Sequence, residues 1–225
     1  MAGEVTNLQS PGGTRGRRRW MKRYLMIAAL AAGLAVPAVA PASPAVTEIS
    51  VEDNFFNPAN PAVANFATGS DFHWTRGAFS SESHNIRQDQ LLFRSGNPTT
   101  GPIDYTITAS AGSYHYYCEV HGTSTSGMQG TVKVRPKKSN VTTTSFRVTW
   151  ASLSTNTGDR FDVRYRVDGG SWVNWKTNTT SFSATFGNGD PVTLAPGHTY
   201  QVQTRTRKAG TTSKSKWSPA VTDTT

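Results

Sequence analysis

The chain contains a single cysteine, Cys118, among its 225 residues. One thiol cannot form an intrachain disulfide, so a small disulfide-stapled scaffold is excluded. The apolar run at residues 25–36 has about 12 residues, fewer than the roughly 20 that a helix needs to cross a bilayer. Helical periodicity is missing after residue 43, apart from a short turn expected near residues 89–92.

Charge is distributed unevenly along the chain, which carries a formal net charge of +9. Six of the basic residues fall within positions 15–23. Residues 43–134 hold four basic and eight acidic side chains, a net charge of −4, whereas residues 135–225 hold 13 and five, a net charge of +8. Halves of opposite sign indicate two domains with different partners.

Residues 1–42 are predicted to be an export signal. Lys22 and Arg23 precede the apolar run, and Pro37 and the small residues Ala40–Pro41–Ala42 follow it, so cleavage before Ser43 is expected. The alternative is a retained anchor. No cysteine follows the run directly, which excludes a lipoprotein anchor.

The predicted export signal does not decide between two export routes. Arg17–Arg18–Arg19–Trp20–Met21–Lys22 resembles a twin-arginine signal, but Met21 could equally be the true start. Either reading predicts an extracellular, cell-surface or periplasmic protein with no stable membrane span after cleavage and no nucleic-acid partner. In such an oxidising space an unpaired thiol needs a role, and binding a metal ion would supply one.

Short runs of alternating apolar residues, separated by Gly, Pro, Asn and Ser, begin after residue 43. This pattern is typical of β-strands with one buried face. We therefore predict an all-β protein of two β-sandwich domains in tandem, with the first domain at residues 43–135, a short linker at 136–140 and the second domain at 141–225.

A possible metal site surrounds the cysteine. Tyr114, Tyr116 and Cys118 share one face of a predicted strand because side chains alternate along it. His121 and Met128 follow, and His84 lies upstream; each of these alone would more often be structural. Together, two imidazoles, one thiolate and one thioether form the donor set of a type 1 (blue) copper centre.

The His84–Asn85 pair, Cys118–x–x–His121 and the downstream Met128 resemble the cupredoxins, such as plastocyanin and pseudoazurin. The resemblance implies a Greek-key sandwich that binds one copper ion through His84, Cys118, His121 and Met128 and transfers single electrons. It also implies that Asn85 ties the first ligand to the cysteine strand, although an ordinary turn asparagine is the alternative.

Three details qualify the resemblance. The segment Gly122–Gly127 is longer than its counterpart in plastocyanin or amicyanin and rich in Thr, Ser and Gly, so we expect a loose loop, an uncertain axial bond to Met128 and a polar surface around His121. Tyr117 is expected to face outward, as an electron route or as an aromatic without a redox role. The segment Asp53–Pro58 is interpreted as a structural turn.

Residues 141–225 resemble a fibronectin type III domain, with Trp150, Leu194–Tyr200 and Trp217–Ser218 as landmarks in the expected order. Strand alternation directs four arginines outward from neighbouring strands, so they should share one face: Arg164, Arg166, Arg205 and Arg207. This face could bind an anionic cell-wall polymer or an acidic protein, or be a solvated basic surface balanced by Asp162 and Asp168.

The first functional hypothesis is an exported one-electron carrier whose fibronectin module spaces it or docks it at the cell surface. Its redox partner would be a protein such as a c-type cytochrome or a membrane oxidoreductase. The alternative is a wall- or matrix-binding protein whose copper is stored, sensed or structural. An enzyme is not expected, because the sequence shows no acid/base or nucleophile constellation. His73 and His115 form no His–x–His pair for a second copper, which argues against oxygen or nitrite chemistry, and are predicted to be surface or structural residues.

Overall fold

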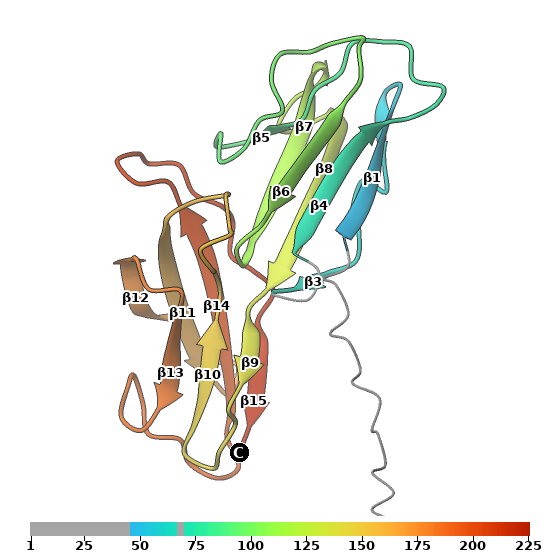
Figure 1. Cartoon of the computed structure of the whole chain (residues 1–225). Helices are drawn as coiled ribbons and strands as arrows, with labels where there is room; N and C mark the ends of the chain where they lie inside the picture. The colour runs from blue at the N-terminus through green and yellow to red at the C-terminus, as the bar shows by residue number, and fades with distance from the viewer. Residues whose placement is uncertain (1–45, 67–69) are drawn as a thin grey trace, which may run out of the picture. The chain divides into compact units, whose positions relative to one another are not determined.

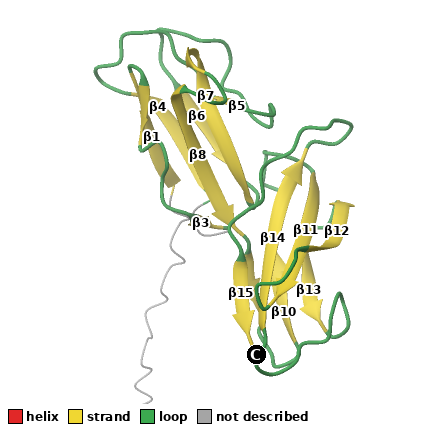
Figure 2. Ribbon diagram, turned by 180° about the vertical axis from the view of Figure 1, so that it is seen from behind, coloured by secondary structure: helices red, strands yellow, loops and turns green. Residues whose placement is uncertain are grey.

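The computed structural model describes residues 46–66 and 70–225, and the predicted export signal lies outside these ranges. In the described ranges the regular elements are all β-strands (Figure 2). No helix suited to crossing a membrane occurs there. The prediction of an all-β protein with two β-sandwiches in tandem is confirmed.

The first sandwich is built from two four-stranded sheets (Figure 1). One has the order β2-β1-β4-β6, with β1 at Val46–Glu52, β2 at Phe55–Asn57, β4 at Asp71–Arg76 and β6 at Asp104–Thr108. The other has the order β3-β8-β7-β5, with β3 at Ala64–Asn65, β8 at Gly127–Arg135, β7 at Gly112–Gly122 and β5 at Arg87–Gln88. The long antiparallel pair β7–β8 forms the centre of this second sheet.

Strand β7 carries the cysteine and shows the predicted alternation. Tyr114, Tyr116 and Cys118 are fully buried on one face of this strand. The ring of Tyr116 packs edge-on against that of Trp74 on β4, with centroids 5.2 Å apart. Because aromatic packing from the opposite sheet holds this face of β7, the thiol at its end has a fixed position.

The second sandwich also has two sheets. One has the order β13-β10-β9, with β9 at Lys137–Ser139, β10 at Ser145–Thr149 and β13 at Ser183–Gly187. The other has the order β12-β11-β14-β15, with β11 at Arg160–Val167, β12 at Val173–Thr179, β14 at Thr199–Arg207 and β15 at Val221–Thr224.

Two aromatic residues that the sequence analysis named as landmarks form hydrogen bonds to the main chain in this sandwich. The buried indole of Trp150 donates a hydrogen bond to the carbonyl of Ser181 at 2.8 Å, and the hydroxyl of Tyr200 accepts one from the amide of Ala195 at 2.9 Å. The second contact is the tyrosine corner of immunoglobulin-like sandwiches. Within the predicted linker at residues 136–140, Lys137–Ser139 forms the short strand β9, which pairs with β10.

A cluster of buried hydroxyls ties strand β7 to residues of the second half of the chain. The hydroxyl of Tyr114 lies 2.9 Å from that of Thr206 and 3.2 Å from that of Thr157. Ser110 contacts all three of these groups. Each buried hydroxyl therefore has partners, which avoids the cost of an unpaired polar group and anchors the end of β7 opposite Cys118.

Candidate metal centre

The structure brings three of the four predicted ligands together. The Sγ atom of Cys118 lies 3.7 Å from Nδ1 of His84 and 3.7 Å from Nδ1 of His121. The two Nδ1 atoms are 3.1 Å apart. His84 and Cys118 are fully buried, and the side chain of His121 is 16% exposed.

These separations fit a single metal ion. A point equidistant from the three atoms lies about 2.0 Å from each, close to the metal–nitrogen distance of about 2.0 Å and the metal–sulfur distance of about 2.3 Å seen in protein sites. Three donors around such a point form a trigonal His2Cys set, which is the arrangement of blue-copper centres.

Carboxylates at the far side of each ring decide which nitrogen is free to bind. Nε2 of His84 is hydrogen-bonded to Oδ1 of Asp53 at 3.0 Å, and Nε2 of His121 forms an ion-pair contact with Oε2 of Glu82 at 3.0 Å. A carboxylate favours an N–H group on the nitrogen that faces it, so the proton is held on Nε2 and the Nδ1 lone pair is left free. Both lone pairs then face each other and the thiol, an arrangement that a shared cation stabilises.

Asp53 is held in its charged form. The hydrogen bond from His84, followed by that from the backbone amide of Glu82, lowers the pKa of Asp53 well below its ordinary value. Sequence reasoning missed the contributions of Asp53 and Glu82 to the site. Asp53 was assigned to a structural turn. Glu82 could have been found from its position two residues before His84.

His84 lies outside the named strands, in an isolated antiparallel bridge with Thr99. Its amide donates to the Thr99 carbonyl and its carbonyl accepts from the Thr99 amide, both at 3.0 Å. The side chain of Asn85 accepts a hydrogen bond from the amide of Glu119 at 2.9 Å and donates to the Glu119 carboxylate. Asn85 therefore ties the His84 segment to the residue after Cys118, as the resemblance implied.

The fourth predicted ligand, Met128, is buried on β8, and its main chain lies beside Gly122. The intervening segment is not loose. Gly122 pairs with Gly127, the amide of Thr123 donates to the carbonyl of Ser126 at 2.8 Å, and the Thr123 hydroxyl accepts from the amide of Ser126.

Glycine is required at both ends of this hairpin. A Cβ on Gly122 would lie 2.5 Å from the carbonyl oxygen of Met128, and Gly127 has a φ of +78°. The prediction of a loose loop was wrong because this close backbone approach closes a short turn, which leaves a β-hairpin between His121 and Met128.

Three other ring side chains of the first sandwich were assigned from the sequence: Tyr117, His73 and His115. Tyr117 does alternate away from Cys118, but it is only 9% exposed because the Arg87 guanidinium covers its ring at 5.3 Å. The expectation that it faces solvent was therefore wrong. His73 lies between Glu48 and Asp104, and His115 lies between Asp89 and Gln129.

Strands β11 and β14 carry the four arginines that were predicted to share one face: Arg164, Arg166, Arg205 and Arg207. Their guanidinium groups contact other side chains of the same sandwich. Arg166, Trp172, Arg164, Trp217 and Arg205 form an alternating arginine–tryptophan stack. Each guanidinium carbon in this stack lies 4.2–4.6 Å from a ring centroid. Such cation–π contacts use the flat faces of the guanidinium groups.

The edges of these guanidinium groups are also occupied. Arg164 and Arg166 donate to the side-chain oxygens of Gln203 and Gln201, respectively. Arg205 and Arg207 each donate to Oδ2 of the buried Asp162 at 2.7 Å. Burial lowers the pKa of Arg164, and the neighbouring charges of Arg205 and Arg166 lower it further.

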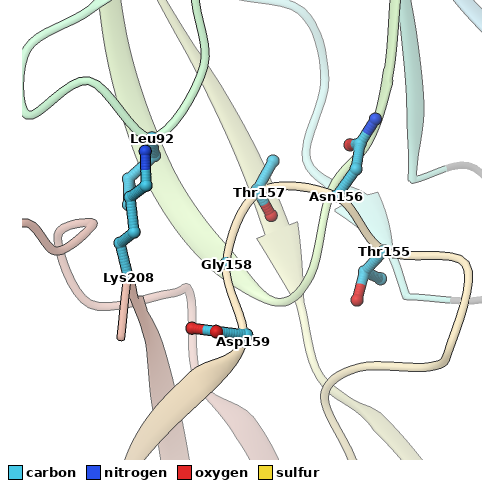
Figure 3. Close-up of a pocket in the computed structure, with 7 residues that line it drawn as sticks. All are labelled: Leu92, Thr155, Asn156, Thr157, Gly158, Asp159 and Lys208. Atoms are coloured by element: carbon cyan, nitrogen blue, oxygen red, sulfur yellow. The ribbon is translucent and has the colours of Figure 1, made fainter. Parts of the chain in front are cut away.

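Figure 3 shows one pocket of the structure, formed by the loop at residues 155–159 together with Leu92 and Lys208. Apart from Thr157, which belongs to the hydroxyl cluster, its residues have no role in the features described so far. None of the predicted metal ligands lines it. The chemistry that the sequence indicated lies instead at the His84–Cys118–His121 cluster.

No family model matches this sequence. A search of curated proteins also finds no match. Among solved structures, one titled "Myokine structure" is similar with a TM-score of 0.31 and 18% identity, covering 40% of this chain and 90% of that chain. Domains A168–A170 of titin give a TM-score of 0.31 and 16% identity, covering 64% of this chain and 55% of that chain.

Proposed function

We propose that this chain is an exported type 1 copper protein that carries single electrons, and that its second sandwich spaces or docks it at the cell surface. The observation that carries the proposal is the convergence of Cys118 Sγ with the Nδ1 atoms of His84 and His121. Among residues 46–66 and 70–225, the further hydrogen-bond partner of these three atoms is the Ser83 carbonyl, 4.0 Å from Sγ.

The donor set favours copper over zinc. Structural zinc sites use four ligands drawn from Cys, His, Asp and Glu, whereas blue-copper sites combine His2Cys with a weak axial thioether. Met128, which is buried and whose main chain lies beside Gly122, would supply that thioether. Copper bound there would supply the one-electron redox change.

The chain's own residues would limit rearrangement during that change. Cys118 is fixed by β7, and Asn85 links the His84 segment to Glu119. Ligands that are held in place before the metal binds need not move when its charge changes, which favours fast transfer. Among the three convergent donors His121 is the exposed one, so electrons are expected to enter and leave at its ring.

The test is to load the purified mature chain with one equivalent of Cu(II) and record its visible spectrum, voltammogram and electron self-exchange rate. We expect an intense blue colour that Cys118→Ser abolishes, a reversible redox wave and fast exchange. Colourless Cu(I) binding with slow exchange would instead favour the alternative, a wall- or matrix-binding protein whose copper is stored or structural. Failure to bind copper through Cys118 would refute both.

A further inference from the structure

The two imidazoles of the metal centre differ from those of His73 and His115 in how their ring nitrogens are paired. In His84 and His121 only Nε2 has a carboxylate partner, while Nδ1 is directed at the thiol. In His73 and His115 both ring nitrogens have an oxygen partner within 2.8 Å. The carboxylates at the metal centre are therefore arranged to leave one nitrogen of each ring available.

The two carboxylates are also connected to each other. Asp53 accepts hydrogen bonds from the amides of Ser81 and Glu82, each at 3.0 Å, and from the hydroxyl of Ser80 at 3.0 Å. It thus fixes the loop that carries Glu82 while it contacts His84. Its oxygens are occupied by these donors, so the group of Asp53, Glu82 and His84 is better explained as a brace than as a second cation site.

We propose that Asp53 and Glu82 act as one carboxylate brace that orients both ligand imidazoles and favours the more highly charged, oxidised state of the bound metal. The inference rests on the proposed copper function and adds a determinant of its redox balance. A negative charge near the metal stabilises Cu(II) more than Cu(I), because the attraction grows with the charge on the ion. A carboxylate acceptor also makes its imidazole a stronger donor.

The brace predicts different effects for its two members. The Glu82 side chain is 47% exposed and contacts His121 as an ion-pair partner, so Glu82→Gln should remove charge with little change in structure. Asp53 supports the Ser80–Glu82 loop as well as His84, so Asp53→Asn should weaken the alignment of both rings. Both are positioning residues, since they act through the histidines.

The experiment compares the full mature chain with Glu82→Gln and with the control Glu48→Gln. Glu48 is a matched control because it also contacts a histidine, His73, that has no predicted metal role. The affinities for Cu(II) and Cu(I) are measured separately by competition with chelators. We expect Glu82→Gln to lower the ratio of Cu(II) to Cu(I) affinity by about tenfold, within the range typical of partners of metal-bound histidines, and Glu48→Gln to leave it nearly unchanged.

A second readout needs no metal. Nitrogen-15 NMR of the histidine rings in the metal-free protein should show His84 and His121 protonated at Nε2, and Glu82→Ala should release His121 into a mixture of tautomers. Equal affinity ratios for Glu82→Gln and Glu48→Gln in a chain that still turns blue would overturn the brace and leave the copper function standing. Absence of thiolate-bound copper in the unmodified chain would overturn both.

Discussion

The candidate metal centre and the arginine–tryptophan stack each bring several side chains of similar chemistry together: potential metal donors in the first, and arginines in the second. At the candidate metal centre, three potential donors face one another across 3.1–3.7 Å. In the stack, each guanidinium has an aromatic face beside it and an oxygen acceptor at its edge.

The difference separates potential metal donors that contact mainly one another from cations whose contacts lie within the protein. Donor atoms that converge on one position gain free energy when they bind a metal ion. Arginines whose hydrogen bonds and flat faces are satisfied within the protein gain little from an external anion, because binding would have to replace existing contacts. Local density of one residue type is thus weaker evidence for a ligand site than donor atoms directed at one another.

The largest expected effect is the loss of copper affinity when a predicted ligand histidine is replaced. His121→Gln should lower copper affinity by roughly 60- to 700-fold, about 2.5–4 kcal/mol, if the 10–16 kcal/mol typical of a structural metal site is shared among four ligands. His115→Gln is the control, since both nitrogens of His115 already have partners. Competition titrations against a chelator measure both, and equal losses would contradict the assignment of ligands.

The second largest effect is a loss of stability when Asp162, the buried carboxylate that contacts Arg205 of the stack, is replaced. Asp162→Asn should destabilise the protein by about 2–3 kcal/mol at neutral pH, because it removes a charge that accepts hydrogen bonds from Arg205 and Arg207. Urea unfolding at constant pH measures the change. Asp168→Asn is the comparison on the exposed side, since the side chain of Asp168 is 50% exposed.

The same variant has a defined pH dependence. Burial raises the pKa of Asp162, but hydrogen bonds from the Asn178 amide, Arg207 and Arg205 outweigh it and leave the pKa below its ordinary value of 3.8. The stabilisation is therefore complete above pH about 4 and is lost as pH falls through the folded-state pKa. We expect the difference between the variant and the parent to shrink on acidification below pH 4, and a constant difference would contradict it.

The sequence predicts what depends on local periodicity better than what depends on contacts between distant segments. The burial of Tyr114, Tyr116 and Cys118 follows from two-residue alternation, which the strand imposes. The covering of Tyr117 by Arg87 does not, because it depends on which strand lies beside β7. The link from Asp53 to His84 spans 31 residues and is likewise a product of tertiary structure.

The predicted ligands and the stack show the same limit. The resemblance carried by the Cys–x–x–His spacing and the His84–Asn85 pair named the three donors that the structure brings together. The outward direction of Arg164 and Arg166 was also sufficient to place them on one face. The presence of Trp172 and Trp217 between the arginines could not be read from alternation, since neither tryptophan lies on β11 or β14.

A smaller effect is expected at the hairpin that joins His121 to Met128. Gly122→Ala would place a methyl group 2.5 Å from the Met128 carbonyl oxygen, so the hairpin must open at a cost of about 2 kcal/mol. Gly101→Ala is the control, because its added carbon would approach only a side-chain oxygen, at 3.2 Å. Thermal unfolding measures stability, and the copper spectrum should change in the first variant alone.

The smallest effect distinguishes stacking from charge in the second sandwich. Arg164→Lys retains the positive charge but loses the planar group that lies between Trp172 and Trp217 and donates to Gln203. If the stack is structural, this variant should lose roughly 1 kcal/mol of stability, the scale of an exposed cation–π contact, in a denaturant titration. If the arginines instead served to attract an anionic polymer, the lysine would preserve binding to it and Arg164→Gln would weaken it. Unchanged stability in the lysine variant, with charge-dependent binding of an acidic polysaccharide, would therefore contradict a structural stack and support an anion-binding face.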